Sequence, residues 1–273
     1  MIGAQERQSL LPAVTALAKR AGDAIMDVYR SDDIGQTSKA DASPLTLADL
    51  ASHRVIVEGL ASLTPDIPVL SEEAADIPYA ERSGWPRFWL VDPLDGTKEF
   101  IKRNGEFTVN IALVENGVPV LGVVYAPVLD TCYYAARDVG AFVGRGDAAA
   151  QPILVSRVAD GEPVRIVASR SHSDVRTAAL LDRLGEHRCV SMGSSLKLCL
   201  VAEGEAHFYP RLGPTMEWDT AAAHAVVLAA GGTVCDSGGV ELRYNKPDLH
   251  NPEFFVCHTE ARQLLDKVQE EVE

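Results

Sequence analysis

Basic residues are scarce in this sequence: 25 Lys and Arg residues stand against 39 Asp and Glu residues, which gives a net charge of −14 over 273 residues. Binding to DNA or RNA needs a basic surface, so this balance argues against a nucleic-acid partner. A small phosphorylated ligand remains compatible with it, because a bound divalent cation can reverse the local sign of an acidic site.

Cysteine is also sparse, with five residues and no Cys-x-x-Cys pair. An odd number without paired spacing disfavours both a disulfide framework and a structural zinc site. Most of these cysteines stand in apolar surroundings and are expected to be small core residues. They are Cys132, Cys189, Cys199, Cys235 and Cys257.

Long apolar runs are absent as well. No stretch reaches about 18 consecutive apolar residues, so no membrane-spanning helix is expected. No basic segment followed by an apolar run marks a signal peptide, and a cytoplasmic location is therefore expected. What is present, 47% hydrophobic and 23% charged residues, is typical of a globular protein with a sizeable core.

The first half of the chain is expected to combine two helices with a sheet. Apolar residues at helical spacing predict an amphipathic helix over 9–30. Thr46, with Asp49 three residues later, predicts the capped start of a second helix. Asn116-Gly117 between two β-rich runs predicts a hairpin. Loops are expected over 31–42 and 74–87, and strands at 69–70, 88–91, 107–114, 118–125, 132–136 and 141–143.

The pattern changes after a stretch rich in Gly, Ala, Asp and Pro at 145–162, which also holds an expected strand at 153–155. Beyond it, strands and helices alternate, which indicates an α/β layer. The chain is therefore expected to divide into residues 1–150 and 151–273. The predicted strands of the second part are 164–168, 189–192, 206–209 and 233–235, and its predicted helices are 174–184, 195–202 and 220–230.

The most suggestive motif is Asp92-Pro93-Leu94-Asp95-Gly96-Thr97, which follows a predicted buried strand. Two carboxylates on one rigid turn can share hard cations, and magnesium prefers such oxygen ligands together with water and substrate phosphate. Pro93 restricts the turn and Gly96 allows a ligand to approach the backbone. Thr97 is expected to begin a helix, whose free N–H groups favour a phosphate. An Asx turn with Thr97 as N-cap is the structural alternative.

Two further acidic segments could complete a site. Glu72-Glu73 follows a predicted strand that fixes its position, although adjacent glutamates are commonly a solvated pair. Asp219, within Glu217-Trp218-Asp219, is placed to N-cap the helix that runs to Ala230. Its carboxylate has enough lone pairs to cap a helix and bind a cation together.

In combination these segments resemble the signature motifs of the inositol monophosphatase superfamily, in the same order and over nearly the whole chain. Within it, three stretches resemble the 3′(2′),5′-bisphosphate nucleotidases of the CysQ type. The resemblance implies an α/β (multidomain α+β) fold, a layered α/β/α/β/α sandwich of the inositol monophosphatase/fructose-1,6-bisphosphatase type. Residues 1–150 would form an N-terminal α+β metal-binding domain and residues 151–273 a C-terminal α/β substrate-binding domain. The motifs are Glu72-Glu73, Asp92–Thr97 and Trp218–Ala222, and the three stretches are Lys98–Asn110, Ser169–His172 and Gly193–Lys197.

The resemblance also implies a site for two or three Mg²⁺ ions, with Mn²⁺ able to substitute and Li⁺ inhibitory. Glu72, Asp92 and the backbone carbonyl of Leu94 would bind one ion. Asp92 would bridge to a second ion that Asp95 and Asp219 also bind. A third, weaker ion would bind to Glu72 and water.

The remaining implied roles concern water and substrate. Asp49 and Thr97 would orient and help deprotonate the attacking water, and Glu72 completes the catalytic set; a capping box is the structural alternative for Asp49. Lys197, taken alone, would be expected at the solvated surface. The implied substrate-binding residues are Gly96, Thr97, Ser169, His172, Ser194, Lys197, Arg211 and Asp219.

The expected reaction is hydrolysis of 3′-phosphoadenosine 5′-phosphate to AMP and phosphate in sulfate assimilation, with 3′-phosphoadenylyl sulfate as a further substrate. Metal-activated water would attack the phosphate in line. Inositol monophosphatase or fructose-1,6-bisphosphatase activity is the alternative within the same fold. A non-catalytic, metal-gated nucleotide-binding module and a metal-independent glycosidase are more remote. Oligomeric state, and a peripheral position on the cytoplasmic face of the inner membrane, stay open.

Overall fold

The computed structural model describes residues 3–31, 33–38, 44–159, 161–169 and 175–259. The helices within these residues are α1 (Ala4–Tyr29), α2 (Leu47–Leu63), a 3₁₀ turn (Glu72–Ala74), α3 (Tyr79–Arg82), α4 (Thr97–Ile101), α5 (Val175–Arg183), α6 (Leu196–Ala202) and α7 (Glu217–Ala229). The strands are β1 (Thr37–Ser38), β2 (Pro44–Leu45), β3 (Val69–Ser71), β4 (Arg87–Asp95), β5 (Thr108–Glu115), β6 (Val118–Ala126), β7 (Thr131–Ala136), β8 (Gly140–Arg145), β9 (Gln151–Pro152), β10 (Val164–Ser169), β11 (His187–Met192), β12 (Phe208–Arg211), β13 (Gly232–Cys235) and β14 (Phe254–His258).

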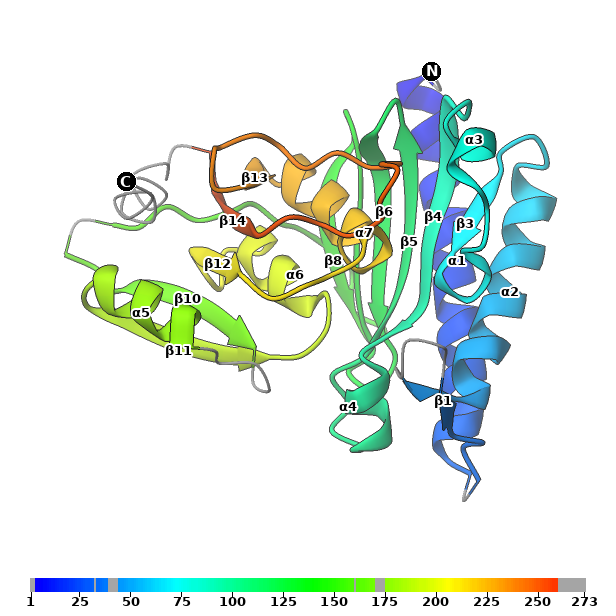
Figure 1. Ribbon diagram of the computed structural model, residues 1–273, viewed down its shortest axis with the longest axis horizontal. Coiled ribbons are helices and arrows are strands. Elements are labelled where there is room, and N and C mark those ends of the chain that lie inside the picture. The colour runs from blue at the N-terminus through cyan, green and yellow to red at the C-terminus, as the bar shows by residue number, and fades with distance from the viewer. Residues whose placement is uncertain (1–2, 32, 39–43, 160, 170–174, 260–273) are drawn as a thin grey trace.

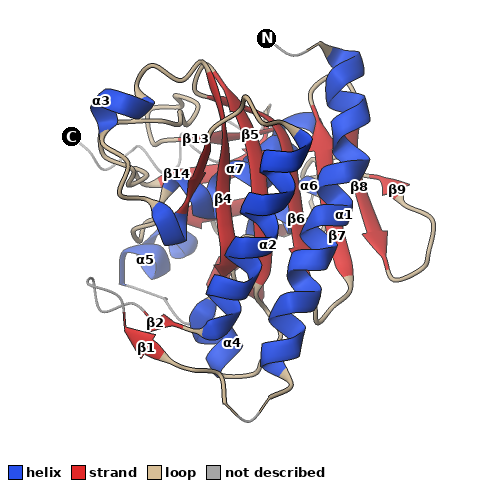
Figure 2. Cartoon of the chain, turned by 90° about the vertical axis from the view of Figure 1, so that its right-hand side faces the viewer, coloured by secondary structure: helices blue, strands red, loops and turns tan. Residues whose placement is uncertain are grey.

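Five layers follow one another along the long axis of the molecule (Figure 1). Helices α1 and α2 cover the outer face of a seven-stranded sheet (Figure 2). Helices α6 and α7 separate that sheet from a five-stranded one, and α5 covers the outer face of the second sheet. The predicted α/β/α/β/α sandwich is therefore confirmed.

Alternation along single strands explains why both sheets are covered on both faces. In β4, Trp89 packs with the cluster under α1 and α2, whereas its neighbour Leu90 packs with the cluster around α7. In β10, Val167 faces the layer of α6 and α7, and Ile166 packs with the cluster under α5. Successive side chains of a strand point to opposite faces, so a strand buried on both faces is apolar throughout.

The two sheets differ in strand direction. The larger has the order β3-β4-β5-β6-β7-β8-β9, and only β3 and β4 pair in parallel. The smaller has the order β11-β10-β12-β14-β13, with β10 parallel to both of its neighbours and β14 antiparallel to β12 and β13. The predicted hairpin at Asn116-Gly117 joins β5 to β6.

Several expectations about elements need correction. The segments 31–42 and 74–87 are not continuous loops, because β1 forms at Thr37–Ser38 and α3 at Tyr79–Arg82. The strand expected at 153–155 is wrong: β9 ends at Pro152, and Ile153 is instead a buried loop residue. Strand β14 was not predicted, since its apolar run, Phe254–Cys257, lies within a segment whose pairing partners are distant in sequence.

The cysteines largely match the expectation. Four are buried, and Cys189 on the edge strand β11 is exposed. All five are free thiols. In the described part of the chain, no helix is both long and apolar enough to cross a membrane.

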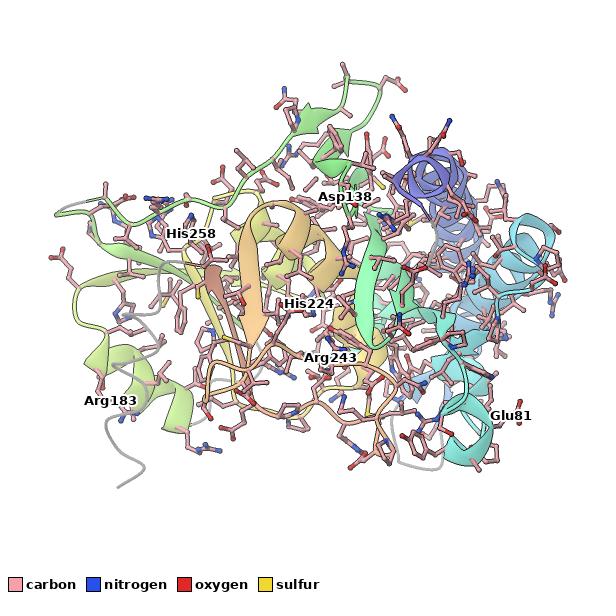
Figure 3. The ribbon with its side chains drawn as sticks, turned by 90° about the horizontal axis from the view of Figure 1, so that it is seen from above. Glu81, Asp138, Arg183, His224, Arg243 and His258 are labelled. Carbon is pink, nitrogen blue, oxygen red and sulfur yellow. The ribbon has the colours of Figure 1, made fainter. Side chains whose placement is uncertain are left out.

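Helix α7 packs unusually close to the larger sheet. A Cβ atom at Gly122 in β6 would lie 2.1 Å from the carbonyl oxygen of Ala222, so glycine is required for this approach. His224 of α7 is fully buried between the sheets, and its Nδ1 lies 2.8 Å from the hydroxyl of Tyr244 (Figure 3). This packing fixes the first turn of α7, which carries Asp219, relative to the ends of β4 and β5.

Candidate active site

An irregularity in β4 brings Asp92 and Asp95 together. Asp92 pairs with Asn110 and Asp95 with Thr108, so one extra residue lies on β4 between the two pairs. In a regular strand, residues three apart point to opposite faces, whereas a bulge of one residue restores them to the same side. The predicted turn is thus a β-bulge that continues the strand, with the N–H of Leu94 donating to Asp92 Oδ1 at 3.0 Å.

Asp219 reaches the site from α7. The prediction that Asp219 is the N-cap is wrong, because α7 begins two residues earlier, at Glu217. Asp219 is instead in the third helical position, and its Oδ2 accepts the N–H of Met216 at 2.8 Å. It therefore fixes the helix start with one oxygen while its other oxygen stays available, as expected for a carboxylate with several lone pairs.

The three aspartates form one compact acidic cluster. Ligand oxygens of Asp92, Asp95 and Asp219 lie within 4.8 Å of one another. Burial raises the pKa of Asp92 well above its usual range, and the charges of Glu72, Asp95 and Asp219 raise it further. Glu72 lies close enough to Asp92 to raise its pKa, so the structure places the fourth predicted side-chain ligand beside the three aspartates.

The same causes act on the other two carboxyls. Burial raises the pKa of Asp95 to about 6, although the Lys197 ammonium and the N–H of Ser195 oppose the shift. Burial, followed by the charge of Asp95, raises the pKa of Asp219. Carboxylates clustered away from water are costly unless a cation compensates them. An all-oxygen set of this kind suits a hard divalent cation, so the residues fit a magnesium site.

A second set of residues surrounds Asp49 at the start of α2. Its Oδ2 accepts the N–H of Thr46 at 2.7 Å and the Thr46 hydroxyl at 2.6 Å, which confirms the capping box. Its Oδ1 lies 3.3 Å from Thr97 Oγ1, which is also 3.4 Å from the carbonyl oxygen of Leu94. Capping and contact with the site are therefore joint roles of one buried carboxylate.

The helix after the bulge, α4, does not begin with Thr97 as its N-cap, which was the structural alternative. Gly96, with φ of 94°, is the N-cap of α4, and Thr97 is the first helical residue. A Cβ at Gly96 would lie 3.2 Å from the carbonyl oxygen of Glu106, in a backbone conformation that L-residues rarely adopt. Thr97 is thereby free to point its hydroxyl toward Asp49.

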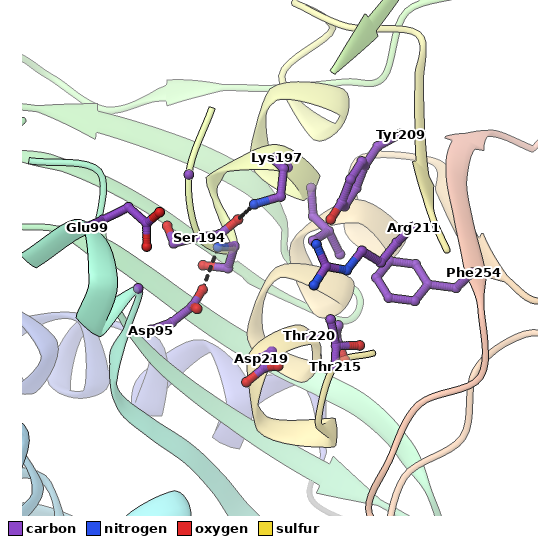
Figure 4. A pocket seen from close by; sticks show the side chains of 14 residues that line it. Asp95, Glu99, Ser194, Lys197, Tyr209, Arg211, Thr215, Asp219, Thr220 and Phe254 are labelled. Atoms are coloured by element: carbon purple, nitrogen blue, oxygen red, sulfur yellow. Dashed lines mark hydrogen bonds between the residues drawn. The ribbon is translucent and has the colours of Figure 1, made fainter. Parts of the chain in front are cut away.

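Basic side chains form the opposite side of the same pocket (Figure 4). Lys197 is only 6% exposed, so the expectation of a solvated lysine is wrong. Its Nζ donates to the carbonyl oxygen of Ser194 at 2.5 Å and lies 5.8 Å from the ring centroid of Tyr209. Burial lowers the pKa of Lys197 to about 8, against the opposing charge of Asp95. Arg211 donates to the carbonyl oxygens of Gly213 and Pro214.

Most predicted substrate contacts meet in this pocket. Ser194 has a left-handed backbone, with φ of 46°, so it precedes α6 and does not share a helical face with Lys197. Ser169 ends β10, and His172 lies outside the described residues. The predicted residues that line the pocket are Asp95, Gly96, Ser194, Lys197, Arg211 and Asp219.

Sequence reasoning missed several pocket residues. Glu99 and Ser195 stand inside stretches that carried the resemblance, and Tyr209 lies two residues from Arg211, so proximity was a usable signal. Phe254 had no such signal, because β14 was not predicted. The residues missed are Gly193, Ser195, Glu99, Leu198, Tyr209, Thr215, Thr220 and Phe254.

Comparison with known proteins agrees with this geometry. Residues 6–273 match the model of the inositol monophosphatase family. The 3′(2′),5′-bisphosphate nucleotidase CysQ of Salmonella typhimurium is 55% identical over 253 residues, which cover 90% of this chain and 99% of the relative. The crystal structure of CysQ from Bacteroides thetaiotaomicron superposes with a TM-score of 0.82 at 46% identity, covering 92% of this chain and 97% of that one. The IMPase of Thermotoga maritima superposes with a TM-score of 0.76 at 28% identity, covering 95% and 98%. With its sandwich fold, its carboxylate cluster and these matches, the chain belongs to the inositol monophosphatase family.

Proposed function

We propose that this chain is a magnesium-dependent 3′(2′),5′-bisphosphate nucleotidase. It hydrolyses 3′-phosphoadenosine 5′-phosphate to AMP and phosphate in sulfate assimilation, and accepts 3′-phosphoadenylyl sulfate as a second substrate. The observation that carries the proposal is a single pocket with a carboxylate cluster on one side and the buried Lys197 on the other. A substrate with two phosphates needs two such positions, and relatives named as bisphosphate nucleotidases match over 90% of the chain.

The carboxylate side would hold the metal. Glu72, Asp92, the carbonyl of Leu94, Asp95 and Asp219 are the proposed ligands, and Asp92 would serve more than one ion. Divalent cations bound there would lower the pKa of water and neutralise charge on the attacking and leaving oxygens. The buried position of Asp92 favours this sharing, because its oxygens are surrounded by the other carboxylates and hold no solvent shell of their own.

Proton transfer is assigned to Thr97 and Asp49. The Thr97 hydroxyl donates a hydrogen bond to Asp49 Oδ1. The lone pairs of Thr97 Oγ1 can therefore accept a proton from the attacking water. The other oxygen of Asp49 is held by two donors from Thr46, which fixes the carboxylate. The water oxygen then bonds to phosphorus as the bond to the ribose oxygen breaks, while the proton of the water passes through Thr97 to Asp49. The ribose alkoxide takes a proton from a solvent water, and no covalent phosphoenzyme forms.

The basic side selects the second phosphate. Lys197 and Arg211 supply positive charge next to the acidic cluster, and Ser194 lies between them and Asp95 (Figure 4). Ser169 and His172 are part of the same proposed contact set, and the N–H groups of Gly96 and Thr97 are proposed to hold the transferred phosphoryl oxygens. In domain terms, residues 1–150 would supply most of the metal ligands, and residues 151–273 would supply Asp219 and select the nucleotide.

A phosphate-release panel tests the substrate. We expect 3′-phosphoadenosine 5′-phosphate to be hydrolysed in preference to inositol 1-phosphate and fructose 1,6-bisphosphate, with activity lost in chelator and restored by Mg²⁺ or Mn²⁺. Equal rates on all three substrates would refute the nucleotide assignment but leave a phosphatase. Activity that persists in chelator would refute the metal chemistry as well.

Two further properties complete the proposal. Li⁺ is expected to inhibit turnover by competing at the metal cluster, which a titration at fixed Mg²⁺ would measure. A cytoplasmic location is expected. Cell fractionation would detect the alternative, which is peripheral association with the inner membrane.

A further inference from the structure

One face of α2 carries three polar side chains that point toward the candidate site. Asp49, Ser52 and His53 are spaced as i, i+3 and i+4, so they lie on the same side of the helix. The same face continues toward the end of α2 with the apolar residues Ile56 and Leu60, which are fully buried and anchor the helix against the sheet. Asp49 contacts Thr97, as described above. The other two side chains have no role in the proposed mechanism.

Ser52 contacts the bulge that holds Asp92 and Asp95. The Ser52 hydroxyl is fully buried and donates to the carbonyl oxygen of Pro93 at 2.7 Å. Pro93 lies inside the bulge, where pairing between β4 and β5 is interrupted. Ser52 therefore fixes the orientation of the peptide between Pro93 and Leu94, and so bears on where the Leu94 carbonyl points.

His53 contacts the other segment of the acidic side. Its Nδ1 lies 2.9 Å from the hydroxyl of Ser71, which is the last residue of β3 and is 1% exposed. Glu72 follows Ser71 directly and begins a 3₁₀ turn. The contact ties the end of β3 to the same helix that holds the bulge.

We infer that Ser52 and His53 are positioning residues for the divalent-cation site, and this rests on the proposed metal-dependent function. Through one rigid helix they align two segments that reach the site from different strands, Ser71-Glu72 and Asp92–Asp95. Removal of a group that contacts and orients a metal ligand typically lowers metal affinity by about 10–100-fold. If these contacts only docked α2 on the sheet, their loss would lower stability and leave metal affinity unchanged.

The test measures the affinity of the full chain for Mn²⁺ by electron paramagnetic resonance. The thermal unfolding temperature in chelator is measured for the same variants. Ser52→Ala and His53→Ala are expected to bind Mn²⁺ about 10–100-fold more weakly than the wild type. His53→Asn, which retains a polar group near the position of Nδ1, is expected to recover part of the affinity.

Ser62→Ala is the matched control. Ser62 is on the same helix, is exposed, and donates to the carbonyl oxygen of Glu58 at 2.9 Å far from the acidic cluster. It removes a hydroxyl of the same kind, so unchanged Mn²⁺ affinity is expected. If Ser52→Ala does not fold, the half-buried His53 and its Asn variant decide the question.

The outcomes separate this inference from the proposed function. Wild-type Mn²⁺ affinity in both alanine variants, or an equal loss in Ser62→Ala, overturns the inference while the nucleotidase proposal stands. A wild-type protein that binds Mn²⁺ but releases no phosphate from the bisphosphate refutes the nucleotidase proposal and leaves the positioning role testable by the same affinities. A wild type that binds no Mn²⁺ overturns both.

Discussion

The two sides of the pocket carry groups of opposite charge, and the surroundings of those groups differ. On the acidic side, burial and mutual repulsion raise the pKa values of Asp92, Asp95 and Asp219. On the basic side, Lys197 and Arg211 each donate to backbone carbonyl oxygens. The basic side is thus oriented before substrate arrives, whereas the acidic side needs a cation to be compensated. Substitutions on one side should therefore affect metal binding, and those on the other should affect substrate binding.

Asp92→Asn is expected to have the largest effect. Loss of the shared ligand removes several kcal/mol of transition-state stabilisation, a roughly thousandfold or greater fall in kcat by the usual conversion. In chelator, the same variant should unfold at a higher temperature than the wild type. A carboxyl whose pKa is raised by folding destabilises the folded state at neutral pH, and the amide carries no charge. Steady-state kinetics and calorimetry measure the two effects; retained turnover would contradict the role of Asp92.

Thr97→Val tests the proton path within the acidic side. The valine keeps the size of the side chain but cannot take a proton from water, so kcat is expected to fall by about 10²-fold, at the low end for general acid–base groups. Mn²⁺ affinity should stay within about threefold of the wild type, because Thr97 is not a proposed ligand. Thr97→Ser, which keeps the hydroxyl, is the control, and equal losses in both variants would count against the proton path.

Lys197→Met tests the basic side. Removal of a charge-assisted contact, worth about 1.5–3 kcal/mol, should raise KM for 3′-phosphoadenosine 5′-phosphate by roughly 10–100-fold. Metal affinity should change little, and hydrolysis of a monophosphate such as inositol 1-phosphate should be less affected than that of the bisphosphate. If both substrates lose activity equally, Lys197 supports the whole site and does not select the second phosphate.

The pH profile gives the smallest and most specific effect. The pKa of Lys197 is lowered to about 8, so its ammonium is present below that pH and is lost as the pH rises through it. KM for the bisphosphate should therefore rise between pH 7 and pH 9, by at most roughly tenfold per pH unit. In Lys197→Arg the side chain stays charged over this range. A rise of the same size in that variant would assign the effect to another group.

Local pattern was sufficient for most elements and for the carboxylates. Helix α2 and its capping box, the β5–β6 hairpin and the strand before Asp92 all follow from spacing over a few residues. The errors fell where non-local contacts decide. The whole of β14 depends on partners in β12 and β13, which no short window contains. The strand expected at 153–155 fails for another reason, because pairing with β8 ends at Pro152.

The environment of each side chain shows the same division. The residue types of Asp92, Asp95 and Asp219 already indicated oxygen ligands, whereas the proton path through Asp49 and Thr97 was implied by the resemblance to the family. Burial of Lys197 could not be inferred, because a lysine near a helix start is normally solvated. Its enclosure depends on the elements packed around α6, among them β12 with Tyr209. The roles of Ser52 and His53 on α2 could not be predicted either, since they depend on contacts with Pro93 and Ser71 that form only in the folded chain.

By itself, the sequence determined the alternation of apolar residues that builds the layers, and the acidic motifs at the strand and helix ends. Only the tertiary structure decided that a one-residue bulge turns Asp92 and Asp95 to one side, and that α7 brings Asp219 to meet them. The physical reason is that residue type fixes what a group can bind, whereas distance, burial and neighbouring charge depend on chain segments that meet only after folding.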